Sequence, residues 1–351
     1  MILAGDIGAT KINLALFNWE KGRVDPIRED TVWTADYESL EEVLTEFLEE
    51  PAASESDSDD LSEDEEASPA NPSSTLSPLT AACFGVPGPV LNNTCRTTNI
   101  PWTIEGDKLA EFLKIPQVRL LNDLEATAYG LPFLEPDEIE DLNPAAPSPP
   151  PDGTRVLLAA GTGLGESLIV WTGKDYHICP SEGGHADFAP NNDLEIELLR
   201  YLRTSYLHVS YERVLSGPGL HLIYQFLRDT QKNEPTWFAE KLPTGDPASL
   251  IAEAGLEGKP DICKNALQLF VSIYGAEAGN MALKTLAMGG VYIGGGIAPK
   301  IIPALQDGTF MKAFLAKGRY KRLLGKMPVR IILNPHTALL GAASIAAGMT
   351  T

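Results

Sequence analysis

The strongest constraint on the fold is a strand, a glycine-rich turn and a second strand, an order that occurs twice in the chain. In MILAGDIGATKINLALF, residues 1–17, an apolar run meets AGDIGAT, and Ile12, Leu14 and Leu16 then alternate with their neighbours at the period of a β-strand. TRVLLAAGTGLGESLIVW, residues 154–171, repeats that order. A chain of 351 residues is long enough for two packed cores, so we expect a duplicated α/β fold around a cleft.

The remaining patterns fill in the two halves. A turn at Gly22 and the VWTA stretch predict a third strand, helical spacing runs from Tyr37 to Leu48, and TAACFGV predicts a strand that PGP ends. Residues 117–121 predict another strand, and a helix begins at Asp123. Residues 132–153 are interpreted as a surface connection, 193–287 as mostly helical, GGVYIGGGIAP as a strand with a glycine turn, and 329–348 as a strand followed by a helix.

We expect a small α/β domain at residues 1–121 with 337–351, and a large α/β domain at 122–336. Within the small domain, residues 51–78 are predicted to be a disordered insertion. SESDSDDLSEDEE has eight acids and no base, and a Pro- and Ser-rich stretch follows, so this segment is too polar to form a core. An acidic docking segment or a phosphorylation site is the functional alternative.

Charge and cysteine content exclude several classes of protein. The net charge of −21 and the pI of about 4.6 disfavour nucleic acid and anionic membranes as partners. The four cysteines have no CxxC spacing, which indicates neither a zinc site nor a disulfide framework and suits a reducing cytosol. The first residues lack the basic region of a signal peptide, so we expect a cytoplasmic protein.

Neither glycine turn fits a helix-based nucleotide motif. AGDIGAT lacks the GxxxxGK(S/T) pattern, and GTGLG at 161–165 precedes strand-like SLIVW where a dinucleotide fold needs a helix. Glycines let backbone N–H groups approach an anion, so two such hairpins could hold a polyphosphate, although each could also be a simple tight turn. Asp6 would repel phosphate unless Mg²⁺ bridges them, and GGG at 294–296 would let a ribose or an adenine lie against backbone.

Polar side chains gather in three other stretches. In LLNDLEATAYG, residues 120–130, Asn122 and Asp123 stand between a strand and a helix, so Asp123 is either a helix N-cap or a carboxylate held over a cleft. SEGGHADFAP and YERVLSGPG supply Glu182, His185 and Glu212, whose donors and acceptors match the hydroxyl groups of a sugar. One His and one Glu make a poor tetrahedral zinc site.

Together these stretches resemble bacterial-type glucokinases of the actin, hexokinase and heat-shock-ATPase superfamily. AGDIGAT and GTGLG resemble the two phosphate motifs and GGVYIGGGIAP the adenosine motif. LLNDLEATAYG resembles the sugar and catalytic motif, and SEGGHADFAP with YERVLSGPG the glucose-binding pair. The resemblance covers nearly the whole chain apart from the insertion and the connection at 132–153. It implies a two-lobed actin-like ATPase fold of the ribonuclease-H-like kind with an interdomain cleft. Ala9 departs from the Asn common in the family, and the zinc-binding cysteines of the related ROK kinases and repressors are absent from the sequence.

The resemblance implies ATP-dependent phosphorylation of glucose at its 6-hydroxyl, with ATP and Mg²⁺ as cofactors. Asp123 is implied as the general base and as a sugar ligand, beside Asn99, Asn122, Glu182, His185 and Glu212. The nucleotide site is implied to be formed by Gly5, Asp6, Gly8, Ala9, Thr10, Lys11, Gly161, Thr162, Gly163, Gly294, Gly295 and Gly296, with Asp6 also serving the metal. A homodimer is compatible with the resemblance, although the sequence does not define the oligomeric state.

Two alternatives stay open. A catalytically weak sugar sensor could use the acidic insertion to dock a partner. A kinase could instead take polyphosphate as its donor and bind it through the basic residues Lys312, Lys317, Arg319, Lys321, Arg322 and Lys326, although a solvated helix face is the simpler interpretation.

Overall fold

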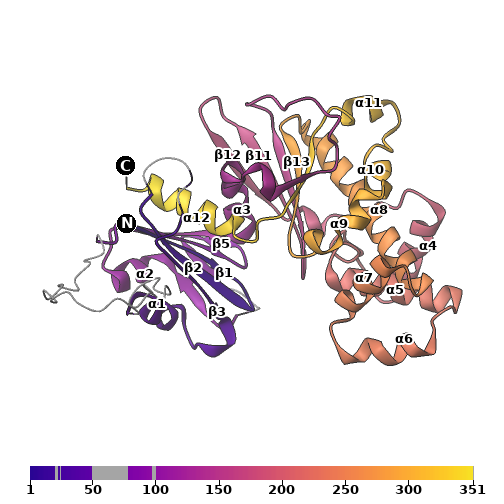
Figure 1. Cartoon of the computed structure of the whole chain (residues 1–351), viewed down its shortest axis with the longest axis horizontal. Helices are drawn as coiled ribbons and strands as arrows, with labels where there is room; N and C mark the ends of the chain where they lie inside the picture. The colour runs from indigo at the N-terminus through magenta and orange to yellow at the C-terminus, as the bar shows by residue number, and fades with distance from the viewer. Residues whose placement is uncertain (20–22, 24, 50–77, 97–99, 351) are drawn as a thin grey trace, which may run out of the picture. The chain divides into compact units, whose positions relative to one another are not determined.

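The computed structural model describes residues 1–19, 23, 25–49, 78–96 and 100–350, so the predicted insertion lies outside the described residues except for its last position. The chain forms two compact units (Figure 1). Unit 1 comprises Met1–Phe133 and His336–Thr351, and unit 2 comprises Leu134–Pro335. The predicted boundary between residues 121 and 122 differs, because α3 (Asp123–Gly130) packs on α12 (Thr337–Gly348) and on β4 (Ala81–Val86), all within unit 1.

Unit 1 is built on a five-stranded sheet in the order β3-β2-β1-β4-β8. β1 (Ile2–Ile7) and β2 (Lys11–Phe17) form the predicted hairpin, and β4 and β8 (Val118–Asn122) run parallel to β1. The strand predicted at VWTA lies earlier, at β3 (Arg28–Trp33). One face of the sheet packs on α1 (Leu40–Glu49) and α2 (Gly106–Leu113), and the other on α3 and α12, which explains why β1 and β4 are apolar throughout.

A second, smaller sheet in unit 1 has no counterpart among the predicted elements. It consists of β5 (Val90–Leu91), β6 (Thr94–Arg96) and β7 (Thr103–Glu105), which pair antiparallel in that order. These strands have two or three residues each, too few for their alternation to be recognised in the sequence.

Unit 2 repeats the sheet of unit 1. β10 (Arg155–Ala160), β11 (Leu164–Trp171) and β12 (Tyr176–Ser181) pair antiparallel, and β13 (Gly290–Gly294) and β14 (Val329–Ile332) are parallel to β10. Strand order and directions match those of unit 1, so the predicted duplicated α/β fold is confirmed. The interpretation of residues 132–153 as a surface connection alone is wrong, because β9 (Ile139–Asp141) pairs with the outer edge of β14.

Helices fill most of residues 193–287, as predicted. They are α4 (Asp193–Leu202), α5 (Gly217–Gln231), α6 (Thr236–Lys241), α7 (Pro247–Glu257) and α8 (Asp261–Thr285). The short helices α9 (Ile302–Gln306), α10 (Thr309–Phe314) and α11 (Lys321–Leu324) connect β13 to β14. α8 packs on β10, where the hydroxyl of Tyr274 donates to the carbonyl of Leu158 at 3.2 Å. In the described part of the chain, no helix is both long and apolar enough to span a membrane.

Candidate active site

Three parallel strands of unit 1 end at one edge of the sheet, and two carboxylates lie there. Asp6 is near the end of β1, Gly85 pairs with it from β4, and Asp123 follows β8 as the first residue of α3. A Cβ built on Gly85 would lie 3.7 Å from Asp6 Oδ1 and 3.8 Å from Asp123 Cα. Gly85 therefore separates the two aspartates without filling the space between them, at the edge where parallel α/β sheets bind ligands.

The two aspartates disfavour each other's charge. Burial, followed by the negative charge of Asp123, raises the pKa of Asp6 to about 6, and a hydrogen bond with Asn13 opposes the rise. Burial also raises the pKa of Asp123, although its carboxylate is open to solvent on one side and accepts hydrogen bonds from Leu124 and Asn122. A divalent cation would relieve this repulsion.

The carboxylate oxygen that Asp6 offers is a ligand type that Mg²⁺ prefers. Among the described residues, no group of three or more His, Cys, Asp or Glu side chains is placed to hold a metal ion. An ion at Asp6 would thus take most of its ligands from water and phosphate, which is the usual mode of Mg²⁺ binding.

Asn122, and not Asp123, is the N-cap of α3. Its Oδ1 accepts from the backbone N–H of Leu124 at 3.1 Å, and its Nδ2 donates to the carbonyl of Gly88 at 3.2 Å. The N-cap interpretation of Asp123 is therefore wrong. Asp123 Oδ1 accepts from the same Leu124 N–H at 2.8 Å, which fixes the direction of the carboxylate at the start of the helix.

The first glycine turn joins β1 to β2. The N–H of Gly8 donates to the carbonyl of Lys11 at 2.8 Å, and a Cβ on Gly8 would lie 2.6 Å from that oxygen, so the turn requires glycine. Ala9 and Thr10 are exposed at its tip. Lys11 Nζ lies 4.7 Å from the ring centre of Trp33, a cation–π contact that holds the lysine beside the turn.

The other two glycine turns lie side by side in unit 2. Ala159 on β10 pairs with Gly294 on β13, so the turns at 161–163 and 294–296 leave the same edge of the sheet. Gly295 has a φ of +82°, and a Cβ there would collide with the backbone of Ala160. Cβ atoms on Gly161 and Gly296 would meet no atom within 4 Å, so both turns have an open side toward solvent.

His185 lies between the two glutamates that were predicted to bind the sugar. Its Nε2 is 4.0 Å from Glu182 Oε2, and its Nδ1 is 3.9 Å from Glu212 Oε1. Glu182 precedes the short turn η4 (Gly183–His185) and His185 is its last residue, so the turn directs both side chains toward one point. All three side chains keep solvent-exposed surface, so a polar ligand can reach them together.

Backbone contacts connect this group to the second glycine turn. Glu212 Oε2 accepts from the N–H of Leu164 at 3.0 Å, and the N–H of Glu212 donates to the carbonyl of Gly184 at 2.8 Å. The N–H of Gly217 donates to the carbonyl of Gly161 at 2.8 Å. The predicted sugar ligands of unit 2 and the second phosphate turn therefore form one connected structure.

The predicted site residues are divided between the two units. Asp6, Asn122, Asp123 and the first glycine turn belong to unit 1, and Glu182, His185, Glu212 and the other two turns belong to unit 2. Asn99 lies outside the described residues. Gly85 and Asn13, which contact the aspartates, were not singled out from the sequence. The signal for Gly85 was present, because a glycine inside an apolar strand often marks a close approach of other groups.

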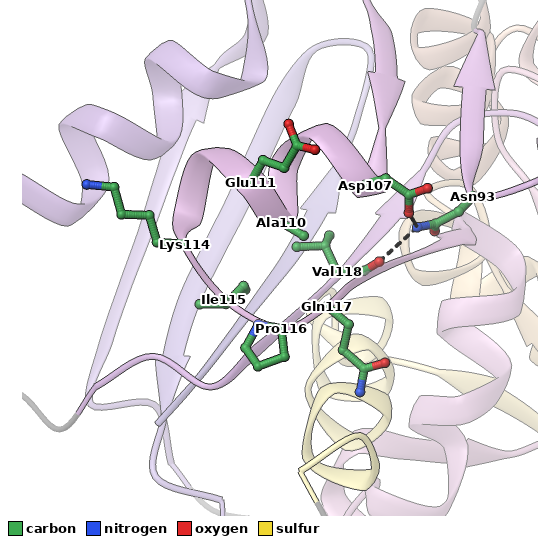
Figure 2. Close-up of a pocket in the computed structure, with 9 residues that line it drawn as sticks. All are labelled: Asn93, Asp107, Ala110, Glu111, Lys114, Ile115, Pro116, Gln117 and Val118. Atoms are coloured by element: carbon green, nitrogen blue, oxygen red, sulfur yellow. Dashed lines mark hydrogen bonds between the residues drawn. The ribbon is translucent and has the colours of Figure 1, made fainter.

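A pocket of about 510 Å³ in unit 1 lies apart from these residues, between α2 and the start of β8 (Figure 2). Both of its side-chain amides are already bonded to protein. Asn93 Nδ2 donates to Asp107 Oδ1 at 3.0 Å and to the carbonyl of Val118 at 2.9 Å, and Gln117 Nε2 donates to the carbonyl of Met349 at 3.0 Å. Oδ1 of Asn93 accepts from the N–H of Leu120 at 3.0 Å. The pocket therefore reflects how the β5–β6 turn is tied to β8, and it contains none of the predicted site residues.

Comparison with known proteins adds an independent finding. A family model described as Glucokinase matches residues 3–349. A protein of Nostoc sp. named glucokinase is 40% identical over 364 aligned residues, which cover 99% of each chain. The crystal structure of a glucokinase from an Antarctic psychrotroph is 26% identical with a TM-score of 0.80, over 99% of this chain and 98% of that one. A ROK family glucokinase from Streptomyces griseus, solved with glucose and AMPPNP, has a TM-score of 0.60 over 99% of each chain, and its 20% identity shows the fold alone.

Proposed function

Because the chain belongs to the glucokinase family, it is a kinase that phosphorylates glucose with ATP, and we propose that Asp123 is the general base of this reaction. The observation that carries the proposal is the position of Asp123. It lies beside Asp6 at the carboxyl ends of three parallel strands, and Asn122 is the residue that caps α3.

In this mechanism the Asp123 carboxylate accepts the proton of the glucose 6-hydroxyl. That oxygen forms a bond to the γ-phosphorus of ATP, the bond from this phosphorus to the β–γ bridging oxygen breaks, and ADP leaves. The raised pKa of Asp123 makes it a stronger base than an ordinary surface aspartate. The N–H of Leu124 holds the carboxylate in place, so little reorganisation is needed when the proton moves.

The other predicted residues bind and orient the substrates. We assign Glu182, His185 and Glu212 to the sugar hydroxyls, and Asn122 to the sugar through the acceptor capacity that remains on its Oδ1. The three glycine turns are assigned to the nucleotide, because their backbone can approach phosphate and ribose closely. Asp6 would hold Mg²⁺ through water, and the ion would neutralise charge on the phosphates. The role of Asn99 stays a prediction, as do a homodimer and a cytoplasmic location.

The alternatives have less support. Of the basic residues considered for polyphosphate, Lys317 is half-buried and donates to Asn280 Oδ1 at 2.6 Å, so it contributes to the interior of unit 2. A sugar sensor would not need Asp6 and Asp123 paired at a ligand-binding edge.

The test is ADP formation by the purified protein with ATP and Mg²⁺, across glucose, mannose, fructose, galactose and N-acetylglucosamine. We expect a preference for glucose, and an Asp123→Ala variant that loses about 10²–10⁴ in kcat while glucose affinity by calorimetry stays close to wild type. Near-normal turnover by that variant would refute the assignment of the base. Glucose binding without turnover would favour the sugar sensor. Turnover with polyphosphate but not with ATP would favour the polyphosphate-dependent kinase.

A further inference from the structure

Two buried glutamates lie behind the predicted sugar ligands of unit 2. Glu166 on β11 is 1% exposed and Glu277 on α8 is 0% exposed. Oε1 of each has no hydrogen-bond partner in the part of the chain that the structure describes. Buried carboxylates are normally well paired with donors, so two incompletely paired ones need an explanation.

Glu166 supports the loop that carries Glu182 and His185. It pairs across the sheet with Ser181, whose Oγ accepts from the N–H of Gly183 at 2.9 Å. Glu166 Oε2 occupies the space that a Cβ on Gly183 would need. Gly183 lies in the turn between Glu182 and His185, so the Glu166 carboxyl contacts the segment that carries both predicted sugar ligands.

Glu277 supports the other side of the same group through Tyr211. Asn280 Nδ2 donates to Glu277 Oε2 at 2.7 Å and to the Tyr211 hydroxyl at 2.9 Å. The N–H of Tyr211 donates to the carbonyl of Ala186 at 2.9 Å, and Tyr211 directly precedes Glu212. The two buried carboxyls therefore connect to both segments that carry the sugar ligands.

Few positive charges compensate for these carboxyls. From α8, Lys284 Nζ lies 3.7 Å from Glu277 Oε1, and the Tyr274 hydroxyl contributes a weak interaction with Glu166. Lys317 acts on Glu277 and on Glu195 of α4. The residues that pair with Glu166 from β10 and β12, Leu158 and Ser181, carry no charge, and the ring of His185 in η4 is exposed.

These surroundings favour the protonated form of Glu166. Burial, followed by the charge of Glu277, raises its pKa to about 7, with Lys284 opposing. Burial also raises the pKa of Glu277, and Asn280, Lys284, Tyr211 and Lys317 oppose that rise. Near neutral pH the pair can therefore gain or lose a proton.

We propose that Glu166 is a positioning residue for glucose binding, and that the Glu166–Glu277 pair must hold a proton for the turn at Gly183 to keep its sugar-binding geometry. Ionising both carboxyls places two negative charges in a dry interior where the ammonium groups of Lys284 and Lys317 act on Glu277, and the repulsion between the two carboxylates displaces the carboxyl that contacts Gly183. The inference rests on the proposed role of Glu182, His185 and Glu212 as glucose ligands.

The experiment compares glucose KM and kcat between about pH 6 and about pH 8.5 in wild type and three variants. Wild-type KM should rise about fivefold or more with pH while kcat changes less. Glu166→Gln, which mimics the protonated carboxyl in shape, should keep a low KM with little of this rise. Glu277→Gln should also show little of this rise, because without a negative charge at position 277 no repulsion displaces the ionised Glu166 carboxylate. Glu140→Gln, on β9 at the far edge of the same sheet, should keep the wild-type profile.

The other possible outcomes distinguish a failure of this inference from a failure of the proposed function. Any dependence on pH that persists in Glu166→Gln belongs to other titratable groups, so the difference between the two profiles is the readout. If Glu166→Gln follows the wild-type curve, or if Glu277→Gln leaves the rise where it is, the inference is overturned while the kinase assignment stands. If the wild type does not turn over glucose, the proposed function fails, and glucose binding by calorimetry still tests the role of Glu166.

Discussion

At the scale of single residues, Asp6 is an unfavourable choice for the fold alone, because burial and Asp123 both oppose its charge. The proposed role of Asp6 toward Mg²⁺ would explain its presence. We expect Asp6→Asn to raise the Mg²⁺ concentration for half-maximal rate about 10- to 100-fold, the range typical of groups that hold a metal through another ligand. Asp30→Asn on β3, an exposed position, should leave this concentration unchanged. Equal Mg²⁺ dependence in both variants would exclude the role of Asp6.

Gly163 lies where the second glycine turn contacts Glu212, one of the proposed sugar ligands. A Cβ there would lie 2.5 Å from Glu212 Oε2, so Gly163→Ala must displace that carboxylate. We expect glucose KM to rise about tenfold, since a misplaced charge-assisted hydrogen bond is worth about 1.5 kcal/mol. Gly161→Ala, in the same turn but with no atom within 4 Å of its Cβ, should act on the KM of ATP and leave that of glucose near wild type. Initial-rate kinetics in both substrates would show the split, and a Gly163→Ala variant with normal glucose KM would contradict it.

Residues with a local signal were predictable, and those whose partners lie far along the chain were not. The pattern placed Asn122 and Asp123 correctly between a strand and a helix, yet it could not tell which of them caps α3, because both side chains can accept from the same N–H. Glu166 was overlooked inside a strand that otherwise looks apolar. Its charged neighbour Glu277 lies more than a hundred residues later, and no periodicity reports such a contact.

At the scale of elements, the two glycine hairpins were predicted well, because period-two alternation and glycine turns are properties of a short stretch. β9 was missed for the opposite reason. Its three residues, IED, show no alternation, and β9 is a strand only because it pairs with β14, where Arg330 Nε donates to Asp141 Oδ1 at 3.0 Å. The observed domain boundary differs from the predicted one for the same reason, because α3 packs on α12, a helix far along the chain.

The packing of α3 on α12 should position Asp123. A Cβ on Gly341 would collide with the carbonyl of Ala126, and one on Gly130 with the carbonyl of Thr337. We expect Gly341→Ala to destabilise the protein by about 1–3 kcal/mol through overpacking, and to lower kcat because the proposed base is the first residue of α3. Gly348→Ala, near the end of the same helix, meets no atom within 4 Å and should be neutral or slightly stabilising. Thermal unfolding with kinetics at permissive temperature checks both, and equal behaviour of the two variants would contradict the role of this contact.

At the scale of the whole molecule, buried carboxyls should make stability depend on pH. The unfolded chain ionises a glutamate near 4.5, whereas Glu166 in the folded protein ionises near 7. Between these values the folded state binds more protons, so the free energy of unfolding falls as the pH rises. Glu166→Gln should be more stable than wild type by up to about 3 kcal/mol at pH 8 and nearly equal to it at pH 5. Urea unfolding at the two pH values measures this, and a constant difference would show that Glu166 titrates normally.

The order of the elements along the chain also determines when each unit can complete its folding during synthesis. Unit 2 is one uninterrupted stretch, whereas unit 1 is completed by α12, which is synthesised after every strand of both sheets. Until that helix emerges from the ribosome, the faces of β1 and β4 that pack on it leave residues such as Ala4 and Ala81 uncovered. In a nascent chain, unit 2 can therefore be folded while the sheet of unit 1 still exposes an apolar face, which can aggregate or bind a chaperone. The close backbone contacts at Gly130 and Gly341 can therefore form only at the end of folding, after α12 has been synthesised and has packed on α3.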